Sequence, residues 1–349
     1  MFHNYSEECM ITMKSYKKTV VIGVGLAMIC STLLAQTPRD PISTIDPPDF
    51  NRTGQTGFQF LHLPTSARSA ALGGIMNGMR DNSATSLFNN PANLVDVKNT
   101  DAAFTNITYI ADIKYMTGAV AKNLGALGTV GVYFANLRTS DMVRTENVVD
   151  ADLGITVRSA DLGTFSAGDV MYGVSFARKI TDVLSVGGNL SRIEEDLADL
   201  KVSNTNIDFG LYYETGFNSL RLAMVARNFG SDTEFTGFTD LYGLPQSVRM
   251  PINFRIGVGY DVIENLSVYA EGVHPNDGPE RLHLAGEYKV MNFLSLRGGY
   301  KMGYDEQSLT FGGGLNFNMS GISGRVDYAF LDYGRLTNVQ VISIGFAFN

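Results

Sequence analysis

The sequence predicts an all-β fold, a transmembrane antiparallel β-barrel of roughly 14 strands. Glycine accounts for 37 of 349 residues and aromatic residues for 11%, whereas charged residues reach only 18%, below the usual quarter or so of soluble chains. From about Ala102 onward, apolar and polar residues alternate in runs close to the roughly 9–11 residues of a tilted membrane strand. The last such run places four large apolar residues on one face: Ile342, Ile344, Phe346 and Phe348.

The composition excludes several other classes of protein. A hydrophobic content of 44% is too high for a disordered chain, and a net charge of −8 does not suit a nucleic-acid-binding module. Two cysteines cannot support a disulfide scaffold. A soluble secreted β-sandwich or propeller would show the same alternation, although no blade-length repeat is present.

The N-terminus has the organisation of a secretory signal peptide, predicted for residues 1–35. Lys14, Lys17 and Lys18 precede the apolar run 19–34, and Ala35 provides a small residue for cleavage. The alternative is a transmembrane anchor, but the run is shorter than the ~20 residues that a spanning helix needs. Residues 1–12 fit a signal peptide poorly, so the true start is expected at Met13. Both cysteines precede the cleavage site, and we expect a mature chain without a thiol.

The remaining chain divides into a leader and one barrel domain. Residues 36–56 are rich in proline, aspartate and threonine and predict an extended leader. The barrel domain is predicted over 57–349, and its first part, 57–95, is unlike the rest. Helix-forming residues 67–72 end at Gly73 and Gly74, and a second helical stretch, 82–88, precedes Pro91.

The alternation assigns one face of each strand to lipid and the other to the interior. A basic side chain facing lipid at mid-depth would cost ~2–4 kcal/mol, whereas charges in the interior can pair across strands. We therefore expect leucine, tyrosine and phenylalanine outside and an interior charge network made of Arg255, Glu271, Arg281, Glu287, Arg297 and Asp327.

Short breaks between runs alternate with longer polar stretches, as expected for periplasmic turns and outer loops. The long stretch 231–250 contains apolar residues that could contact a partner protein: Phe235, Phe238, Leu241, Tyr242 and Leu244. The alternative for this stretch is a loop folded back over the mouth of the barrel.

The sequence contains no recognisable catalytic or cofactor-binding motif, so we expect a protein that is not an enzyme, with no cofactor and no metal. None of the four histidines is spaced for a metal. Asp277 and Glu280 could form an acidic pair or a calcium site, but a capped loop with Arg281 as counter-ion is the favoured interpretation.

Two segments resemble a known family of outer-membrane proteins. The segment 60–74, FLHLPTSARSAALGG, and the segment Asn90-Pro91-Ala92-Asn93-Leu94 are similar to the opening signature of the PorV/PorQ family, within the wider group of FadL-like barrels. The family usually has Gly after Asn-Pro-Ala, where this chain has Asn93. The resemblance covers about 57–349, including the segments 228–230, 274–281, 286–288, 297–300 and 326–328.

The resemblance implies a 14-stranded barrel in the outer membrane of Bacteroidetes, with 57–95 folded inward as a hatch. Its expected hatch residues are Arg68, Gly73, Gly74, Asn90, Pro91 and Ala92. It also implies a non-catalytic component of the type IX secretion system. Such a component would bind the C-terminal signal domains of secreted cargo, or partner subunits, through outer loops, with outer-membrane lipid or lipopolysaccharide around it. The FadL relationship implies an alternative function, a passive channel for hydrophobic small molecules.

Overall fold

The computed structural model describes residues 54–150, 155–159, 163–198, 200–239, 245–319 and 321–348. The predicted signal peptide and residues 36–53 of the leader lie outside these ranges. Among the described residues, no helix is long and apolar enough to cross a membrane.

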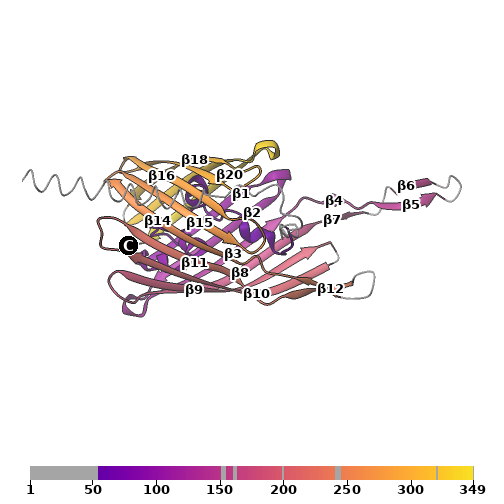
Figure 1. The fold of residues 1–349 in the computed structure, drawn as a ribbon, viewed down its shortest axis with the longest axis horizontal. Helices are drawn as coiled ribbons and strands as arrows, with labels where there is room; N and C mark the ends of the chain where they lie inside the picture. The colour runs from indigo at the N-terminus through magenta and orange to yellow at the C-terminus, as the bar shows by residue number, and fades with distance from the viewer. Residues whose placement is uncertain are drawn as a thin grey trace, which may run out of the picture. The chain divides into compact units, whose positions relative to one another are not determined.

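Fourteen strands of the described chain form the wall of a closed barrel, as the sequence predicted (Figure 1). Consecutive wall strands pair antiparallel, and β1 pairs with β20 to close the ring, with Thr100 opposite Phe348 at the seam. The wall strands are β1 (Thr100–Thr108), β2 (Lys114–Asn123), β3 (Thr129–Arg138), β8 (Ala167–Lys179), β9 (Leu184–Leu197), β10 (Leu200–Glu214), β11 (Arg221–Phe229), β14 (Asn253–Ile263), β15 (Leu266–Pro275), β16 (Arg281–Met291), β17 (Leu294–Met302), β18 (Leu309–Met319), β19 (Ile322–Asp332) and β20 (Asn338–Phe348).

The wall has an apolar exterior and a polar interior, because side chains alternate along each strand. Phe104, Ile256 and Phe311 are exposed on the outside of the barrel, whereas Asp101 and Glu287 are buried inside it. A closed sheet leaves no unpaired edge in the wall, which is the condition for strands to cross a hydrocarbon layer. The protein is thus an outer-membrane β-barrel.

The two ends of the barrel differ in the length of their connections. At one end the connections are short turns, such as 180–183 and 264–265. At the other end lie the longer connections 139–166 and 230–252, which marks it as the outer end. The long connections carry two-stranded extensions: β4 (Met142–Val143) with β7 (Thr164–Phe165), β5 (Glu146–Asp150) with β6 (Ile155–Ser159), and β12 (Thr233–Thr239) with β13 (Pro245–Val248).

The described residues before β1 are helical and irregular and lie inside the barrel, where Figure 1 shows them in indigo. They are buried against inward side chains of the wall and form much of the apolar core. Their elements are η1 (Gln59–His62), α2 (Ala67–Ala71), α3 (Ser86–Asn89) and η2 (Pro91–Asp96). Three further single turns, η3 (Ile110–Asp112), η4 (Gly125–Leu127) and η5 (Gly334–Leu336), lie in connections between strands.

Candidate functional site: the hatch and the cavity above it

We call residues 64–97 the hatch, a range that differs from the predicted 57–95 because residues 54–63 are described separately below. The hatch is fixed to the wall by polar contacts around the barrel. Its backbone N–H groups donate to inward side chains: Ala67 to Ser343 Oγ on β20 at 2.8 Å and Gly73 to Thr310 Oγ1 on β18 at 3.0 Å. On the far side, Asn189 Nδ2 on β9 donates to the Leu87 carbonyl at 2.9 Å. A short segment without long helices exposes many backbone polar groups, and the inward side chains satisfy them.

The Asn-Pro-Ala turn lies at the centre of this arrangement. Asn90 Oδ1 accepts from the Ala92 N–H at 3.0 Å and caps η2, whose first residue is Pro91. Asn90 Nδ2 donates to Asn77 Oδ1 at 2.8 Å, joining two parts of the hatch. The wall approaches so closely here that a Cβ at Gly210 would collide with Asn90 Oδ1.

The two expected hatch glycines have different neighbours. Gly73 and Gly74 both have positive φ, at +70° and +77°, and end α2. The Gly73 backbone contacts Tyr300 and Gly299 of β17, whereas Gly74 faces the side chain of Lys301.

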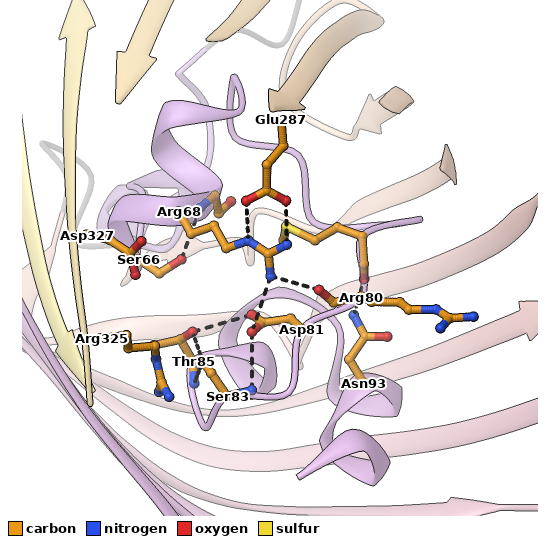
Figure 2. A network of polar contacts seen from close by, with 12 residues as sticks. Ser66, Arg68, Arg80, Asp81, Ser83, Thr85, Asn93, Glu287, Arg325 and Asp327 are labelled. Atoms are coloured by element: carbon orange, nitrogen blue, oxygen red, sulfur yellow. Dashed lines mark hydrogen bonds and ion pairs between the residues drawn. The ribbon is translucent and has the colours of Figure 1, made fainter. Parts of the chain in front are cut away.

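Arg68 is the main charged link between hatch and wall (Figure 2). Its guanidinium makes a bidentate contact with Glu287 on β16, Nη2 to Oε2 at 2.7 Å and Nε to Oε1 at 3.2 Å. Glu287 also accepts from Arg297 Nε at 2.7 Å, and Arg297 Nη1 donates to Asp327 Oδ1 at 2.5 Å. Arg68 and three of the six predicted network residues therefore form one connected chain of ion pairs.

The other predicted network residues lie in two different environments. Arg255 Nη1 pairs with Glu271 Oε1 at 2.9 Å, and Glu271 Oε2 accepts from the N–H groups of Met76 at 3.0 Å and Asn77 at 2.8 Å. This pair is thus a second anchor of the hatch. Arg281 takes part in neither anchor: its guanidinium lies over the ring of Tyr304, 4.5 Å from the ring centroid.

Sequence analysis did not single out two further anchors. Arg325 on β19 forms a bidentate pair with Asp101 on β1, both contacts at 2.6 Å, and Asp101 Oδ1 also accepts from the Ala84 N–H of the hatch. Arg221 on β11 pairs with Asp261 and donates from Nε to the Gly78 carbonyl at 3.1 Å. The alternation places these residues on inward faces, but only the fold shows which hatch atoms they reach.

Residues 54–63, here called the strap, cross the outer end of the interior beneath the loops. The Gly57 N–H donates to the Arg249 carbonyl at 3.0 Å, and the Phe58 N–H donates to Glu195 Oε2 at 3.0 Å. Phe58 is fully buried in this position. The strap therefore closes part of the barrel mouth, held by the connection before β14 and by the wall strand β9.

Asp277, in the connection between β15 and β16, is the principal partner of the strap. Its Oδ2 atom accepts from Thr56 Oγ1 at 2.5 Å and Gln59 Nε2 at 3.1 Å, and it lies 3.4 Å from His62 Nε2. Burial raises the pKa of this carboxyl, but the hydrogen bonds from His62, Thr56 and Gln59 outweigh it and hold the pKa well below its usual range. The favoured interpretation, in which Arg281 is the counter-ion of this loop, is wrong for Asp277, because Asp277 faces the strap. The alternative acidic pair does not form either, because Glu280 faces His274.

A cavity of about 500 Å³ lies between the strap, the hatch and the outer connections. One sector of its wall is apolar and comes from the strap, β3, β19 and the neighbouring connections: Phe60, Leu63, Tyr109, Leu137, Leu331 and Tyr333. Another sector, from β14, β16, β17 and the connection after β17, is polar: Arg255, Arg281, His283, Lys301, Tyr304 and Gln307. The cavity can accommodate a small organic molecule with one apolar and one polar side.

A second cavity, of about 490 Å³, includes the Arg68–Glu287 network. Charged residues dominate its lining, among them Arg80, Asp96, Glu214 and Lys289. Within the described part of the chain, no three His, Cys, Asp or Glu side chains are grouped to hold a metal ion. The outer cavity is consequently the better candidate for binding an apolar molecule.

The five loop residues predicted to contact a partner are only partly described. Phe235 is half-buried and packs against the core cluster, so its ring is turned toward the barrel. Phe238 lies in β12, and Leu241, Tyr242 and Leu244 lie outside the described residues.

Solved structures with the same architecture include two toluene transporters and a FadL homologue. The toluene transporter TodX of Pseudomonas putida is 13% identical, with a TM-score of 0.56 over 81% of this chain and 97% of its own. The toluene transporter TbuX of Ralstonia pickettii is also 13% identical, with a TM-score of 0.54 over 82% of this chain and 99% of its own. A FadL homologue of Pseudomonas aeruginosa is 12% identical, with a TM-score of 0.51 over 82% and 98%.

The fold is that of FadL-type barrels. No family model matches the chain, and no curated protein sequence matches it. The FadL-like part of the sequence resemblance is thus supported at the level of fold, whereas PorV/PorQ membership and the type IX role stay predictions.

Proposed function

We propose that this chain is a passive outer-membrane channel for hydrophobic small molecules. The observation that carries the proposal is the outer cavity, which lies inside the barrel and has an apolar sector rich in aromatic rings. An apolar molecule that enters from outside leaves water and contacts this surface. The transfer is favourable by a free energy of roughly 25 cal/mol per Å² of apolar area buried. The likeness in fold to two toluene transporters adds support.

Passage through the barrel requires the hatch to move, because the hatch lies beneath the cavity. Its polar links to the wall are ion pairs and hydrogen bonds at separate points, such as Arg68–Glu287 and Asn77–Glu271. Such contacts can be exchanged for water one by one as a segment shifts. The strap adds a second barrier on the outer side, and it too is held by polar contacts, chiefly those of Asp277.

Uptake of radiolabelled toluene by cells that express the protein in a lipopolysaccharide-containing outer membrane tests the proposal. Leu63→Trp fills the apolar sector from the strap and should reduce uptake to the level of cells without the protein. Leu127→Trp is the matched control, because Leu127 lies in η4, on a short turn at the opposite end and 70% exposed. Wild-type uptake no faster than in cells without the protein would contradict the channel.

The type IX role is a second candidate, supported by one structural feature. The pairs β4–β7 and β5–β6 extend beyond the wall at the outer end (Figure 1), with free strand edges to which another protein could add a strand. A gentle-detergent pull-down of the tagged protein from its native outer membrane, with mass spectrometry of the recovered chains, tests this candidate. Recovery of secretion subunits or of cargo with C-terminal signal domains would favour it, and recovery of the barrel alone would count against it.

A further inference from the structure

The polar sector of the outer cavity contains two cations that lack an acidic partner. Within the described chain, no carboxylate lies within 4.0 Å of Arg281 or Lys301 in an ion pair, whereas Arg255 nearby pairs with Glu271 at 2.9 Å. Lys301 Nζ donates to Gln307 Oε1 at 2.8 Å, which orients the ammonium group without neutralising it. Buried or half-buried cations usually have a counter-charge, so this pair points to an anion that the chain itself does not supply.

The two cations lie together around one aromatic ring. The guanidinium of Arg281 is 4.5 Å and Lys301 Nζ is 5.0 Å from the ring centroid of Tyr304. The Tyr304 hydroxyl is 2.9 Å from His283 Nε2, which fixes the ring against β16. Both cations therefore lie within about 5 Å of the same ring, and they come from the neighbouring strands β16 and β17.

Unsatisfied polar atoms at the same place are a second, independent observation. His283 is almost completely buried, and its Nδ1 atom has no hydrogen-bond partner. The nearest acidic oxygen, Glu271 Oε1, is 3.9 Å away, beyond hydrogen-bond distance. Nε of Arg281 is also buried without a partner. Buried polar groups without partners are uncommon in folded proteins and call for an explanation.

The remainder of the cavity favours a flat apolar group. Phe60, Tyr109 and Tyr333 present aromatic rings to it, and Tyr109 packs edge-to-face against Tyr333 with centroids 5.8 Å apart. Aromatic rings prefer such edge and offset contacts with another ring. Two carboxylates also line the cavity. Asp169 lies on β8, away from β16 and β17, and Asp277 already accepts hydrogen bonds from the strap.

We propose that the outer cavity binds aromatic carboxylates, with the carboxylate between Arg281 and Lys301 and the ring against Phe60, Tyr109 and Tyr333. This inference rests on the proposed channel function and narrows its substrates from hydrophobic molecules in general to aromatic anions. Neutral hydrocarbons such as toluene would occupy the apolar sector alone and would bind more weakly than benzoate.

Equilibrium dialysis of radiolabelled benzoate against the purified full barrel in detergent at about pH 6 tests the site. Arg281→Gln and Lys301→Met should each weaken benzoate binding at least tenfold, because each removes a charge-assisted hydrogen bond. Arg281→Lys should restore most of the affinity, which a purely structural role of the guanidinium would not explain. Lys289→Met is the matched control, since Lys289 lines the other cavity. Far-UV circular dichroism establishes that each variant is folded.

Toluene uptake by cells separates failure of this site from failure of the channel. Benzoate binding to the wild type that is lost in both variants, together with toluene uptake by cells with the wild type, supports the proposal. Toluene uptake without any benzoate binding overturns the anion site and leaves the channel intact, as does benzoate binding that survives in both variants. If benzoate does not bind and toluene is not taken up, both the anion site and the channel function are refuted.

Discussion

Glu287 is the wall residue whose replacement by its amide, glutamine, should weaken the attachment of the hatch most. Its carboxylate accepts from Arg68 and Arg297 and is almost completely buried. Glu287→Gln keeps the shape of the side chain but removes the negative charge, and the new amide N–H₂ cannot accept from a guanidinium. Two buried cations would then face a neutral group.

The expected loss of stability in Glu287→Gln depends on which other partners Arg68 and Arg297 keep. Breaking a buried ion pair by removing one partner typically costs about 3–5 kcal/mol. Arg297 keeps Asp327 at 2.5 Å, and Arg68 keeps the Arg80 carbonyl at 2.7 Å and Asp81 at 3.7 Å. The lower end of the range is therefore expected, about 3 kcal/mol of the free energy of unfolding.

Guanidinium-induced unfolding in detergent, followed by far-UV circular dichroism, measures this loss, since the chain has no tryptophan. Arg335→Gln is the control: Arg335 pairs with Glu306 between two outer connections in water, and removing its charge should change nothing measurable. A double-mutant cycle with Arg68→Met should show strong coupling to Glu287→Gln. A loss below about 1 kcal/mol, the order expected of an exposed pair, would refute the anchoring role of Glu287.

Three further predictions concern the strap, the central turn and the lipid face. Asp277→Asn should increase amide hydrogen exchange over residues 56–63. The folded-state pKa of Asp277 is depressed, so wild-type Asp277 stabilises the strap fully above about pH 4. The difference in exchange between variant and wild type should disappear only as the pH falls further. Gly210→Ala should cost about 1–3 kcal/mol by collision with Asn90, measured by thermal unfolding, whereas Gly272→Ala, with open space around it, should not. Ile344→Arg should cost ~2–4 kcal/mol on refolding into lipid vesicles, and an unchanged stability would mean that this face does not contact lipid.

The wall of the barrel could be predicted from the sequence because one physical rule governs it throughout. A strand between lipid and a polar interior has to alternate apolar and polar side chains. The sequence therefore indicates directly that Ile256 faces outward and Arg255 inward. The two expected helical stretches before β1 also appear, α2 from Ala67 to Ala71 and the shorter α3 from Ser86 to Asn89.

The contacts of the interior could not be predicted in the same way. Alternation places Arg281 inside but does not distinguish a residue that anchors the hatch from one that faces a cavity, because that depends on where the irregular segment runs. The expectation that Arg281 is the counter-ion of Asp277 was wrong for the same reason: the partners of Asp277, which are Thr56, Gln59 and His62, are more than 200 positions away in the sequence. Long-range polar contacts of this kind leave no local pattern.

The path of the chain through the interior constrains how the barrel can assemble. The strap lies at the outer end, Val97 at the opposite end contacts Asn123 after the hatch has run through the lumen, and only then does β1 begin the wall. A closed wall offers no gap for a folded segment of this size, so β20 must pair with β1 around residues already in place. Both seam strands bond to the hatch, Ser343 of β20 to Ala67 and Asp101 of β1 to Ala84. A slip of one residue at the seam would turn one of these two side chains toward lipid, and the hatch thus acts as an internal template that selects the register in which the barrel closes.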